Sequence, residues 1–322
     1  MASPALPSLM GVILAAGKGT RMRPFSEHWP KPILPLGGKP LIAHQVEMLK
    51  GMGVEDIVIV IGHLGHQVVR ELGDGERFGV RIRYVEQGET LGIAHAVYKL
   101  ESYIDRPFFL FLGDIYFETE NLASMPARMM GPGGADGVLA VMREPDAERI
   151  RRNFVVLTDA NGRVHRVVEK PRFARTDLKG CGIYLFDQSF FDAVRRTPRT
   201  AMRDEYEITD AIQIYIDDGY RVEAAEVIKA DLNLSYPMDL LDLNLRWLDV
   251  HGARNLIGRS VQIADGAKLE RCLVLDGAVI EKPIAMRECL VFPNVRVKHD
   301  RDLSRAIITQ ETEIVDNEAS RP

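Results

Sequence analysis

A short segment near the N-terminus combines glycines and basic residues in a pattern suited to phosphate. Residues 14–40 read LAAGKGTRMRPFSEHWPKPILPLGGKP. Gly17 and Gly19, with Thr20, make a tight turn whose backbone N–H groups can approach a polyanion because no Cβ blocks the way. Arg21 can clamp a phosphate through two N–H groups, and Lys31, held between prolines, supplies a point charge. We therefore expect a phosphate-binding loop here.

The spacing excludes two familiar phosphate motifs. A Walker A loop needs a glycine five residues before its Gly-Lys pair and Ser or Thr after the lysine, whereas Gly19 follows Lys18. The dinucleotide fingerprint G-x-G-x-x-G needs glycine at position 22, which is Met22. What remains is G-x-G-T-R followed by Lys31-Pro32 and Lys39-Pro40, a far more specific combination than a glycine-rich turn.

Carboxylates also stand at the ends of predicted strands. Asp114 ends the apolar run FLFLGD, at the kind of strand end where ligands collect in α/β sheets, and a helix-capping role fits it as well as a metal role. In VVEKP, Glu169 and Lys170 by themselves are best explained as a solvated pair at a strand end.

With these motifs the chain resembles the sugar-phosphate nucleotidylyltransferases, which make NDP-sugars, and most of all the members that use dTTP or UTP with glucose 1-phosphate. The signature L-A-x-G-x-G-T-R-[LM]-x-P, then K-P-x-x-P, then K-P, matches throughout, and the resemblance runs from about Met10 to Trp247. It implies that Lys31 stabilises charge at the attacked α-phosphate, and that the nucleotide is bound by Leu14, Ala16, Gly17, Gly19, Thr20, Arg21, Gln87 and Gly92.

The segment VEQGETLGIAHAV matches the family's base-recognition pattern Q-x-x-x-x-G-x-A at Gln87 and Gly92. A Gln amide offers one donor and one acceptor side, complementary to the imide edge of uracil or thymine. Because guanine-using relatives usually carry Glu at this station, the resemblance favours a pyrimidine nucleotide.

The resemblance makes Asp114 the principal Mg²⁺ ligand and places Asn233, in NLSYPMDLLDLN, where many members have a second metal-binding Asp. Asp231 replaces a usual aromatic residue. Residues two apart on a strand share a face, so Asp231 can supply charge that the weaker ligand Asn233 lacks. The alternative is that Asp231 is merely solvated at a strand end.

The sugar phosphate is expected at Glu169, Lys170, Gly182 and Arg203, by resemblance to the family's E-K-P and arginine stations. Taken alone, Arg203 reads as a surface charge. Phe154 stands where members commonly have a glycine whose N–H meets the sugar, and Gly180-Cys181-Gly182 replaces the common Asn-Ala-Gly. These departures concern the identity of the sugar more than the reaction.

The implied reaction is an in-line attack of a sugar-phosphate oxygen on the α-phosphorus, with pyrophosphate as the leaving group. Positioning and charge neutralisation supply most catalysis in such transfers, so Arg21, Lys31 and Asp114 are the expected catalytic residues, with Mg²⁺ as cofactor. The alternatives are a mannose-1-phosphate guanylyltransferase and a non-catalytic, nucleotide-sugar-binding regulatory subunit. An acetyltransferase tail is discounted because only about 70 residues follow Gly252.

The elements that must position these residues follow an α/β pattern. Buried strand-like runs at 11–14, 57–61, 108–112 and 138–141, with helical spacing over 40–52, predict a parallel β-α-β unit in an α/β/α layered, Rossmann-like domain with a mixed, mostly parallel sheet. Strands are also expected at 164–169 and 182–186, and a helix at 237–250.

Beyond Gly252, apolar residues recur every six positions from Val261 to Leu303, with a second set from Ile257 to Leu275. This period is typical of a left-handed β-helix. We therefore expect a nucleotidylyltransferase domain at 1–252 and a short β-helix-like domain at 253–322, whose acidic end frays. Because the second domain contains none of the residues that match the family's catalytic motifs, it is expected to serve assembly or regulation.

The composition of the 322 residues suits a globular enzyme, with 46% hydrophobic and 27% charged residues and a net charge of -5. This balance gives no basic excess to attract nucleic acid or anionic membrane. Three separated cysteines favour a reducing cytoplasm over a disulfide framework, and no apolar run approaches the ~20 residues of a membrane span. We expect a cytoplasmic homo-oligomer whose partners are its small-molecule substrates.

Overall fold

The computed structural model describes residues 8–130, 133–173, 175–201 and 204–316. They form two compact units: unit 1 comprises the residues up to Gly17 and Gln45–Leu232, and unit 2 comprises Lys18–His44 and the residues from Asn233 on. The units differ from the expected domains at 1–252 and 253–322. The reason is that the phosphate-loop segment packs with the C-terminal part of the chain, for example where the Phe25 ring stacks on Phe292.

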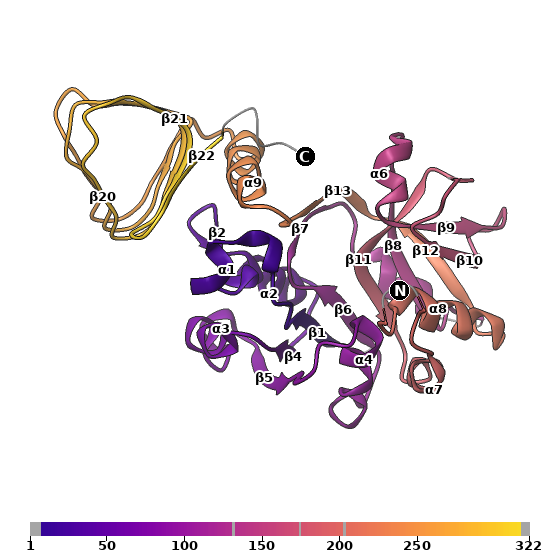
Figure 1. The fold of residues 1–322 in the computed structure, drawn as a ribbon. Helices are drawn as coiled ribbons and strands as arrows, with labels where there is room; N and C mark the ends of the chain where they lie inside the picture. The colour runs from indigo at the N-terminus through magenta and orange to yellow at the C-terminus, as the bar shows by residue number, and fades with distance from the viewer. Residues whose placement is uncertain (1–7, 131–132, 174, 202–203, 317–322) are drawn as a thin grey trace, which may run out of the picture. The chain divides into compact units, whose positions relative to one another are not determined.

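Unit 1 is built on a nine-stranded mixed sheet in which β1 is central (Figure 1). β1 lies between β4 and β6 and is parallel to both, and β4 is parallel to β5. The strands of this part are β1 (Met10–Ala15), β4 (Asp56–Ile61), β5 (Arg81–Glu86) and β6 (Phe108–Leu112). The continuous apolar sequences of β1, β4 and β6 are explained by helices on both faces of the sheet.

The other part of the sheet is joined through β11, which pairs antiparallel with β6 on one side and β8 on the other. The pairing of β11 with β8 is irregular between Gly180 and Tyr184. The strands of this part are β8 (Gly137–Arg143), β9 (Phe154–Thr158), β10 (Val164–Glu169), β11 (Leu178–Phe186) and β12 (Val222–Glu226). A separate two-stranded sheet pairs β7 (Ile115–Thr119) with β13 (Ile228–Asn233).

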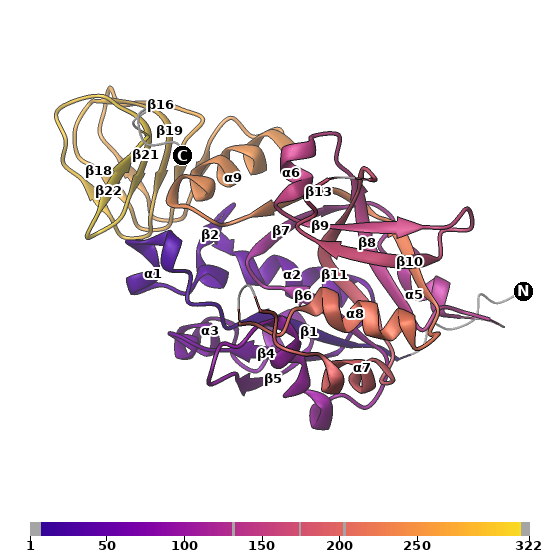
Figure 2. The same ribbon diagram turned by 45° about the vertical axis from the view of Figure 1, so that its right-hand side comes forward.

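Helices cover both faces of the parallel part. Met10 and Val12 of β1 belong to one core cluster with residues of α4, α7 and α8, which Figures 1 and 2 show grouped on one side. Gly11 points to the other face, where an added Cβ would fall 2.8 Å from Leu49 of α2. The helices are α2 (Leu41–Gly51), α3 (Gly65–Leu72), α4 (Ile93–Tyr98), α5 (Ser124–Met129), α6 (Ala147–Arg151), α7 (Phe190–Arg196) and α8 (Ile208–Asp217), with 3₁₀ turns η3 (Glu76–Phe78) and η4 (Glu101–Tyr103).

Unit 2 combines the phosphate-loop segment, the helix α9 (Pro237–Val250) and a stack of β-coils. The loop segment contains η1 (Thr20–Met22), α1 (Phe25–His28), η2 (Lys31–Ile33), β2 (Pro35–Leu36) and β3 (Lys39–Pro40). The coils contain β14 (Leu256–Ile257), β15 (Gln262–Ile263), β16 (Lys268–Glu270), β17 (Leu273–Val274), β18 (Val279–Ile280), β19 (Ala285–Val291), β20 (Arg296–Val297), β21 (Leu303–Ile308) and β22 (Glu313–Val315).

The coils stack in parallel register, and Figure 1 shows their three-sided outline. Leu256 pairs with Leu273, Leu273 with Leu290 and Leu290 with Ile307, so each coil advances by 17 residues. A strict six-residue repeat would require 18, and the expected spacing therefore does not hold around the whole coil. One side of each coil is a residue shorter, since β14, β15, β16 and β17 begin at 256, 262, 268 and 273.

Most predicted elements are confirmed, including the β1-α2-β4 unit, β10 at 164–169 and α9 at 237–250. The α/β fold class is confirmed, and the C-terminal region is a β-helix-like stack whose left-handed sense stays a prediction. Among the described residues, no helix combines the length and apolarity that crossing a membrane would require. Cys181, Cys272 and Cys289 are buried free thiols.

Candidate active site

In unit 1 the carboxyl ends of β1 and β6 are tightly joined. Gly113 donates its N–H to the Leu14 carbonyl at 2.9 Å, and a Cβ on Gly113 would fall 2.7 Å from that oxygen. Ala16 is buried, whereas Gly17 is exposed and has open space where its Cβ would be. The strand end is thus fixed by its neighbour and opens at the point where the phosphate loop begins.

Asp114 lies in the turn between β6 and β7, and this turn is held by Gln45. The Gln45 amide donates to the carbonyls of Leu112 and Ile115, both at 2.8 Å, so it fixes the backbone on either side of Asp114. Gln45 is 1% exposed. Sequence reasoning missed it, although a Gln spaced four residues from Leu41 and from Leu49 on an apolar helix face is a usable signal.

The base-recognition segment is anchored at both ends. Gln87 is buried, donates its N–H to Ile61 at 2.9 Å, and accepts a hydrogen bond from the Lys99 ammonium at its carbonyl. At the other end, a Cβ on Gly92 would fall 2.5 Å from the Tyr206 carbonyl, and Ala94 donates to that oxygen at 3.0 Å. The backbone from Gln87 to Gly92 is therefore held by α4 and by the loop before α8.

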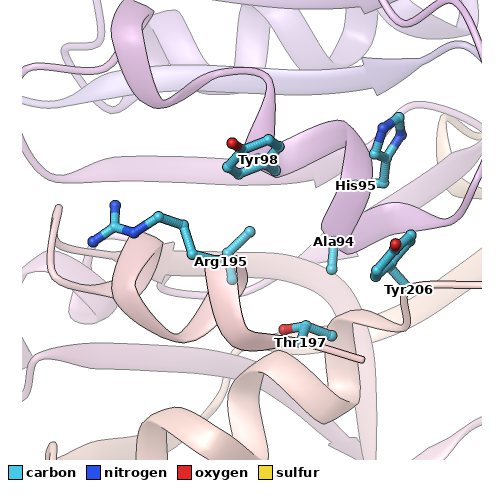
Figure 3. Close-up of a pocket in the computed structure, with 7 residues that line it drawn as sticks. Ala94, His95, Tyr98, Arg195, Thr197 and Tyr206 are labelled. Atoms are coloured by element: carbon cyan, nitrogen blue, oxygen red, sulfur yellow. The ribbon is translucent and has the colours of Figure 1, made fainter. Parts of the chain in front are cut away.

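A pocket of about 170 Å³ lies beside this segment, between α4 and the end of α7 (Figure 3). His95 and Tyr98 come from α4, and the His95 ring stacks on Tyr206 with centroids 6.0 Å apart. Burial, followed by the nearby Lys99 charge, lowers the pKa of His95 and keeps its imidazole neutral at pH 7. The pocket thus adjoins the base-recognition segment without containing Gln87 or Gly92.

The described residues expected to bind the sugar phosphate lie on or next to β10 and β11, beside β9. Glu169 pairs with Phe154 across the β9–β10 ladder, and Lys170, with φ 43°, donates its N–H to Asn153 at 2.9 Å. The Phe154 ring occupies the space above Gly180, where an added Cβ would fall 1.9 Å from the ring. The two departures from the family pattern, Phe154 and Gly180, are therefore coupled, because the large side chain at 154 leaves no room for a side chain at 180.

Two further residues, Gly182 and Arg203, are expected to bind the sugar phosphate. Gly182 is buried against Leu112 and Ile115, where a Cβ would fall 2.8 Å from Leu112 and 2.9 Å from Ile115. Arg203 lies outside the described residues. The structure therefore relates Glu169, Lys170 and Phe154 directly, and it leaves the role of Arg203 as a prediction.

Asp231 is engaged in a buried ion pair. Its carboxylate accepts a hydrogen bond from Lys179, and the two side chains are only 10% and 7% exposed. Burial first, and then the Asp231 charge, raises the pKa of the adjacent Cys181 thiol well above its ordinary value. Asp231 is thus neither solvated nor free to give its charge to a metal without competition from Lys179.

In unit 2 the predicted phosphate loop is closely packed at Gly19. Gly19 has φ 61°, and a Cβ there would fall 3.1 Å from two methylene carbons of Lys31, a side chain that is 9% exposed. Arg21 is exposed on η1, and its guanidinium carbon lies 5.7 Å from the centroid of the Tyr236 ring. Unit 2 by itself therefore brings the two expected phosphate-binding cations to one loop, with Tyr236 three residues after Asn233.

A second contact holds the loop to α9. Asn244 accepts from the Gly37 N–H at 3.0 Å and donates to the Pro35 carbonyl at 2.8 Å, while a Cβ on Gly37 would fall 2.2 Å from the Trp247 ring. Asn244 ends the motif NLSYPMDLLDLN, so its place in that motif was a signal for a role that sequence reasoning did not assign.

The donor chemistry fits a magnesium ion. Mg²⁺ is bound by hard oxygen ligands, often one or two carboxylates completed by substrate phosphates. Asp114, half-buried on a turn fixed by Gln45, supplies such a carboxylate in unit 1, and Asn233, exposed at the end of β13, supplies an amide oxygen in unit 2.

The family model of nucleotidyl transferases matches residues 10–265. The chain therefore belongs to the nucleotidyl transferase family. Within it, the chain is 35% identical over 231 residues to the UTP–glucose-1-phosphate uridylyltransferase AglF of Haloferax volcanii, covering 72% of this chain and 93% of that protein. It is 30% identical over 305 residues to a glucose-1-phosphate thymidylyltransferase of Streptomyces griseus, covering 91% and 83%.

Two further relatives are also nucleotidyltransferases. The nucleotidyltransferase Agl11 of Haloferax volcanii, from low-salt glycan biosynthesis, is 33% identical over 238 residues, and the match spans 73% of this chain and 65% of Agl11, just under two thirds. Mannose-1-phosphate guanylyltransferase 1 of Arabidopsis thaliana is 26% identical over 315 residues, or 93% of this chain and 86% of that protein.

A crystal structure shares the fold. It is that of a Bacillus anthracis protein assigned as a glucose-1-phosphate thymidylyltransferase, in complex with sucrose, with a TM-score of 0.67, 27% identity, and coverage of 75% of this chain and 96% of that one. The expected family, fold class and enzyme class, a sugar-1-phosphate nucleotidyltransferase, are confirmed.

Proposed function

We propose that this protein transfers a nucleotidyl group from dTTP or UTP to a hexose 1-phosphate, with glucose 1-phosphate favoured, and releases pyrophosphate in NDP-sugar biosynthesis. The observation that carries the proposal is the loop of unit 2, in which the Lys31 stem packs against Gly19 and Arg21 lies on the 3₁₀ turn that Gly19 begins. Two cations on one fixed loop suit a triphosphate, because charge neutralisation and positioning dominate such transfers.

Each residue has a role in this proposal. Gly17, Gly19, Thr20 and Arg21 bind the triphosphate, Lys31 stabilises the developing charge at the α-phosphorus, and Glu169 with Lys170 orients the sugar 1-phosphate. A phosphate oxygen of that sugar attacks in line, so no side chain forms a covalent intermediate. Asp114 and Asn233 would hold Mg²⁺, which when bound neutralises phosphate charge, whereas Asp231 serves its ion pair with Lys179.

Gln87 supports a pyrimidine nucleotide, since a Gln amide is complementary to the imide edge of uracil or thymine and the backbone of Gln87 is held by Ile61 and Lys99. The alternative is GTP with mannose 1-phosphate, which is favoured by the similarity to the Arabidopsis guanylyltransferase over 93% of this chain. We further propose a cytoplasmic enzyme, in keeping with its three buried free thiols; homo-oligomerisation remains a prediction.

The test is a screen of pyrophosphate release with the four NTPs and dTTP against several sugar 1-phosphates. The expected result is turnover with dTTP or UTP and glucose 1-phosphate, and a loss of about 10²–10³-fold in Asp114→Asn. A preference for GTP above tenfold would establish the guanylyltransferase alternative. Binding of nucleotide without turnover for any pair would establish the non-catalytic alternative, and a trapped nucleotidyl-enzyme would contradict direct transfer.

A further inference from the structure

The segment between Arg21 and Lys31 has its own anchor in unit 2. It consists mainly of α1 (Phe25–His28) and Trp29, and α1 packs against η1, which carries Arg21. Phe25 is 1% exposed, so its ring is a fixed part of the core and not a surface side chain. Whatever holds this ring therefore fixes the chain between the two cations.

The residue that holds it belongs to the β-coils. Phe292 directly follows β19, and its N–H donates to the Ile308 carbonyl of the next coil at 2.9 Å, so its backbone is part of the coil ladder. Its ring stacks on Phe25 with centroids 5.9 Å apart and planes at 16°, and it meets the Trp29 ring at 5.3 Å. Figure 2 shows α1 beside the coils.

We propose that Phe292 is a positioning residue for nucleotide binding, through which the β-coils hold Arg21 and Lys31 in their working geometry. The inference rests on the proposed function, because it takes these two cations to be the triphosphate clamp. Aromatic side chains fill a large volume with few rotatable bonds, so the Phe25–Trp29–Phe292 cluster is a rigid link. Displacement of reacting groups by about 1 Å can cost 10²-fold in rate.

This assignment extends the role of the coils beyond assembly or regulation. Arg21 lies in η1, just before α1 in the chain, and Lys31 begins η2, just after Trp29 and Pro30. Both cations therefore flank the segment that Phe292 anchors. The coils therefore contribute to the chemistry by fixing the segment between the two cations.

The experiment uses the full-length chain and three variants. Phe292→Ala removes the ring, Phe292→Leu keeps most of the apolar volume, and Ile280→Ala is the matched control. Ile280 is 1% exposed on β18, where its strand pairs with β15 and β20, away from the β19 ladder. Ile280→Ala thus disturbs coil packing in a different sheet from that of β19, the strand that leads into Phe292.

The readouts separate positioning from loss of folded protein. In Phe292→Ala we expect KM for the nucleotide to rise at least tenfold with KM for the sugar 1-phosphate changed less than twofold, and Phe292→Leu to recover most of the loss. A purely structural defect lowers the active fraction, so it reduces kcat and leaves both KM values in place. Equal effects of Phe292→Ala and Ile280→Ala on nucleotide KM would overturn the proposal.

A second readout is independent of turnover. The two tryptophans of the chain are Trp29 and Trp247, so the difference between the wild type and Trp29→Phe isolates the emission of the residue that contacts Phe292. Titration with UTP, dTTP and inorganic triphosphate gives dissociation constants, which should rise at least tenfold in Phe292→Ala. If the wild type binds these probes but transfers no nucleotide, the proposed function fails while the anchoring is still measured; unchanged constants in Phe292→Ala would refute the anchoring alone.

Discussion

The two compact units hold their candidate site residues by different means. In unit 1, Asp114 and Glu169 stand at strand ends, and neighbouring strands or a single buried side chain such as Gln45 fix them. In unit 2, Arg21 and Lys31 lie on a loop with little regular structure, fixed by Asn244 and Phe292 from more than 200 residues further along the chain.

The difference has a consequence for how the candidate residues of each unit respond to mutation. Strand ends in a buried sheet move only if the sheet itself is disturbed, so damage in unit 1 should appear first as lost stability. A loop held by a few distant side chains can shift while the fold persists, so damage in unit 2 should appear first as weaker nucleotide binding. Four substitutions test this contrast.

The largest expected effect is on unit 1. Lys179→Met leaves Asp231 as a buried, unpaired charge, which should lower the free energy of unfolding by about 3–5 kcal/mol. The double variant Lys179→Met/Asp231→Leu should restore most of it, because an apolar pair can replace a buried ion pair. Urea unfolding measures both. The control is Arg143→Met, whose partners Asp177 and Glu226 are exposed and whose loss should cost less than about 1 kcal/mol.

Gln45→Leu should come next. It removes the amide that binds the Leu112 and Ile115 carbonyls, at a cost of about 1–3 kcal/mol, and loosens the turn that carries Asp114. We expect lower kcat and a raised Mg²⁺ concentration for half-maximal turnover. Leu49→Ala, on the same helix and equally buried, should cost comparable stability without moving the Mg²⁺ titration. The same shift in both variants would mean that Gln45 is only a packing residue.

In unit 2, Asn244→Ala should raise KM for the nucleotide about fivefold while lowering the unfolding free energy by about 2 kcal/mol. Asn255 is the matched control, because it makes the same kinds of bond inside the coils, donating to Leu269 and accepting from Cys272. Asn255→Ala should lower stability similarly and leave nucleotide KM within about twofold of wild type. A larger KM effect in the control would break the contrast between the units.

The smallest effect is expected at Tyr236. The Arg21 guanidinium lies over its ring, and an exposed cation–π contact contributes about 0.5–1 kcal/mol. Tyr236→Leu should therefore raise nucleotide KM about two- to fivefold, whereas Tyr236→Phe, which keeps the ring face, should match the wild type. Steady-state kinetics at varied nucleotide distinguish them; equal KM in all three proteins would remove Tyr236 from the site.

Much of this protein could be read from local sequence. Apolar runs of strand length gave β1, β4 and β6 because helices bury both faces of the sheet, and the spacing of Leu241, Leu245 and Leu248 gave α9. The phosphate-loop motif and the family could also be predicted from the sequence, because a motif is defined by residue types at fixed spacing. These properties depend on residue types at given spacings along the chain and not on which distant segments pack together.

Tertiary structure alone decided how the loop is held and what the unusual residues do. Phe154 requires Gly180, Lys179 neutralises Asp231, and Phe292 reaches Phe25, although no local pattern links the members of any pair. Likewise, each coil has 17 residues because one of its three sides is a residue shorter, and the six-residue apolar spacing does not predict this shorter side. Contacts between distant segments depend on how whole elements pack, and a linear sequence specifies that packing only through the complete fold.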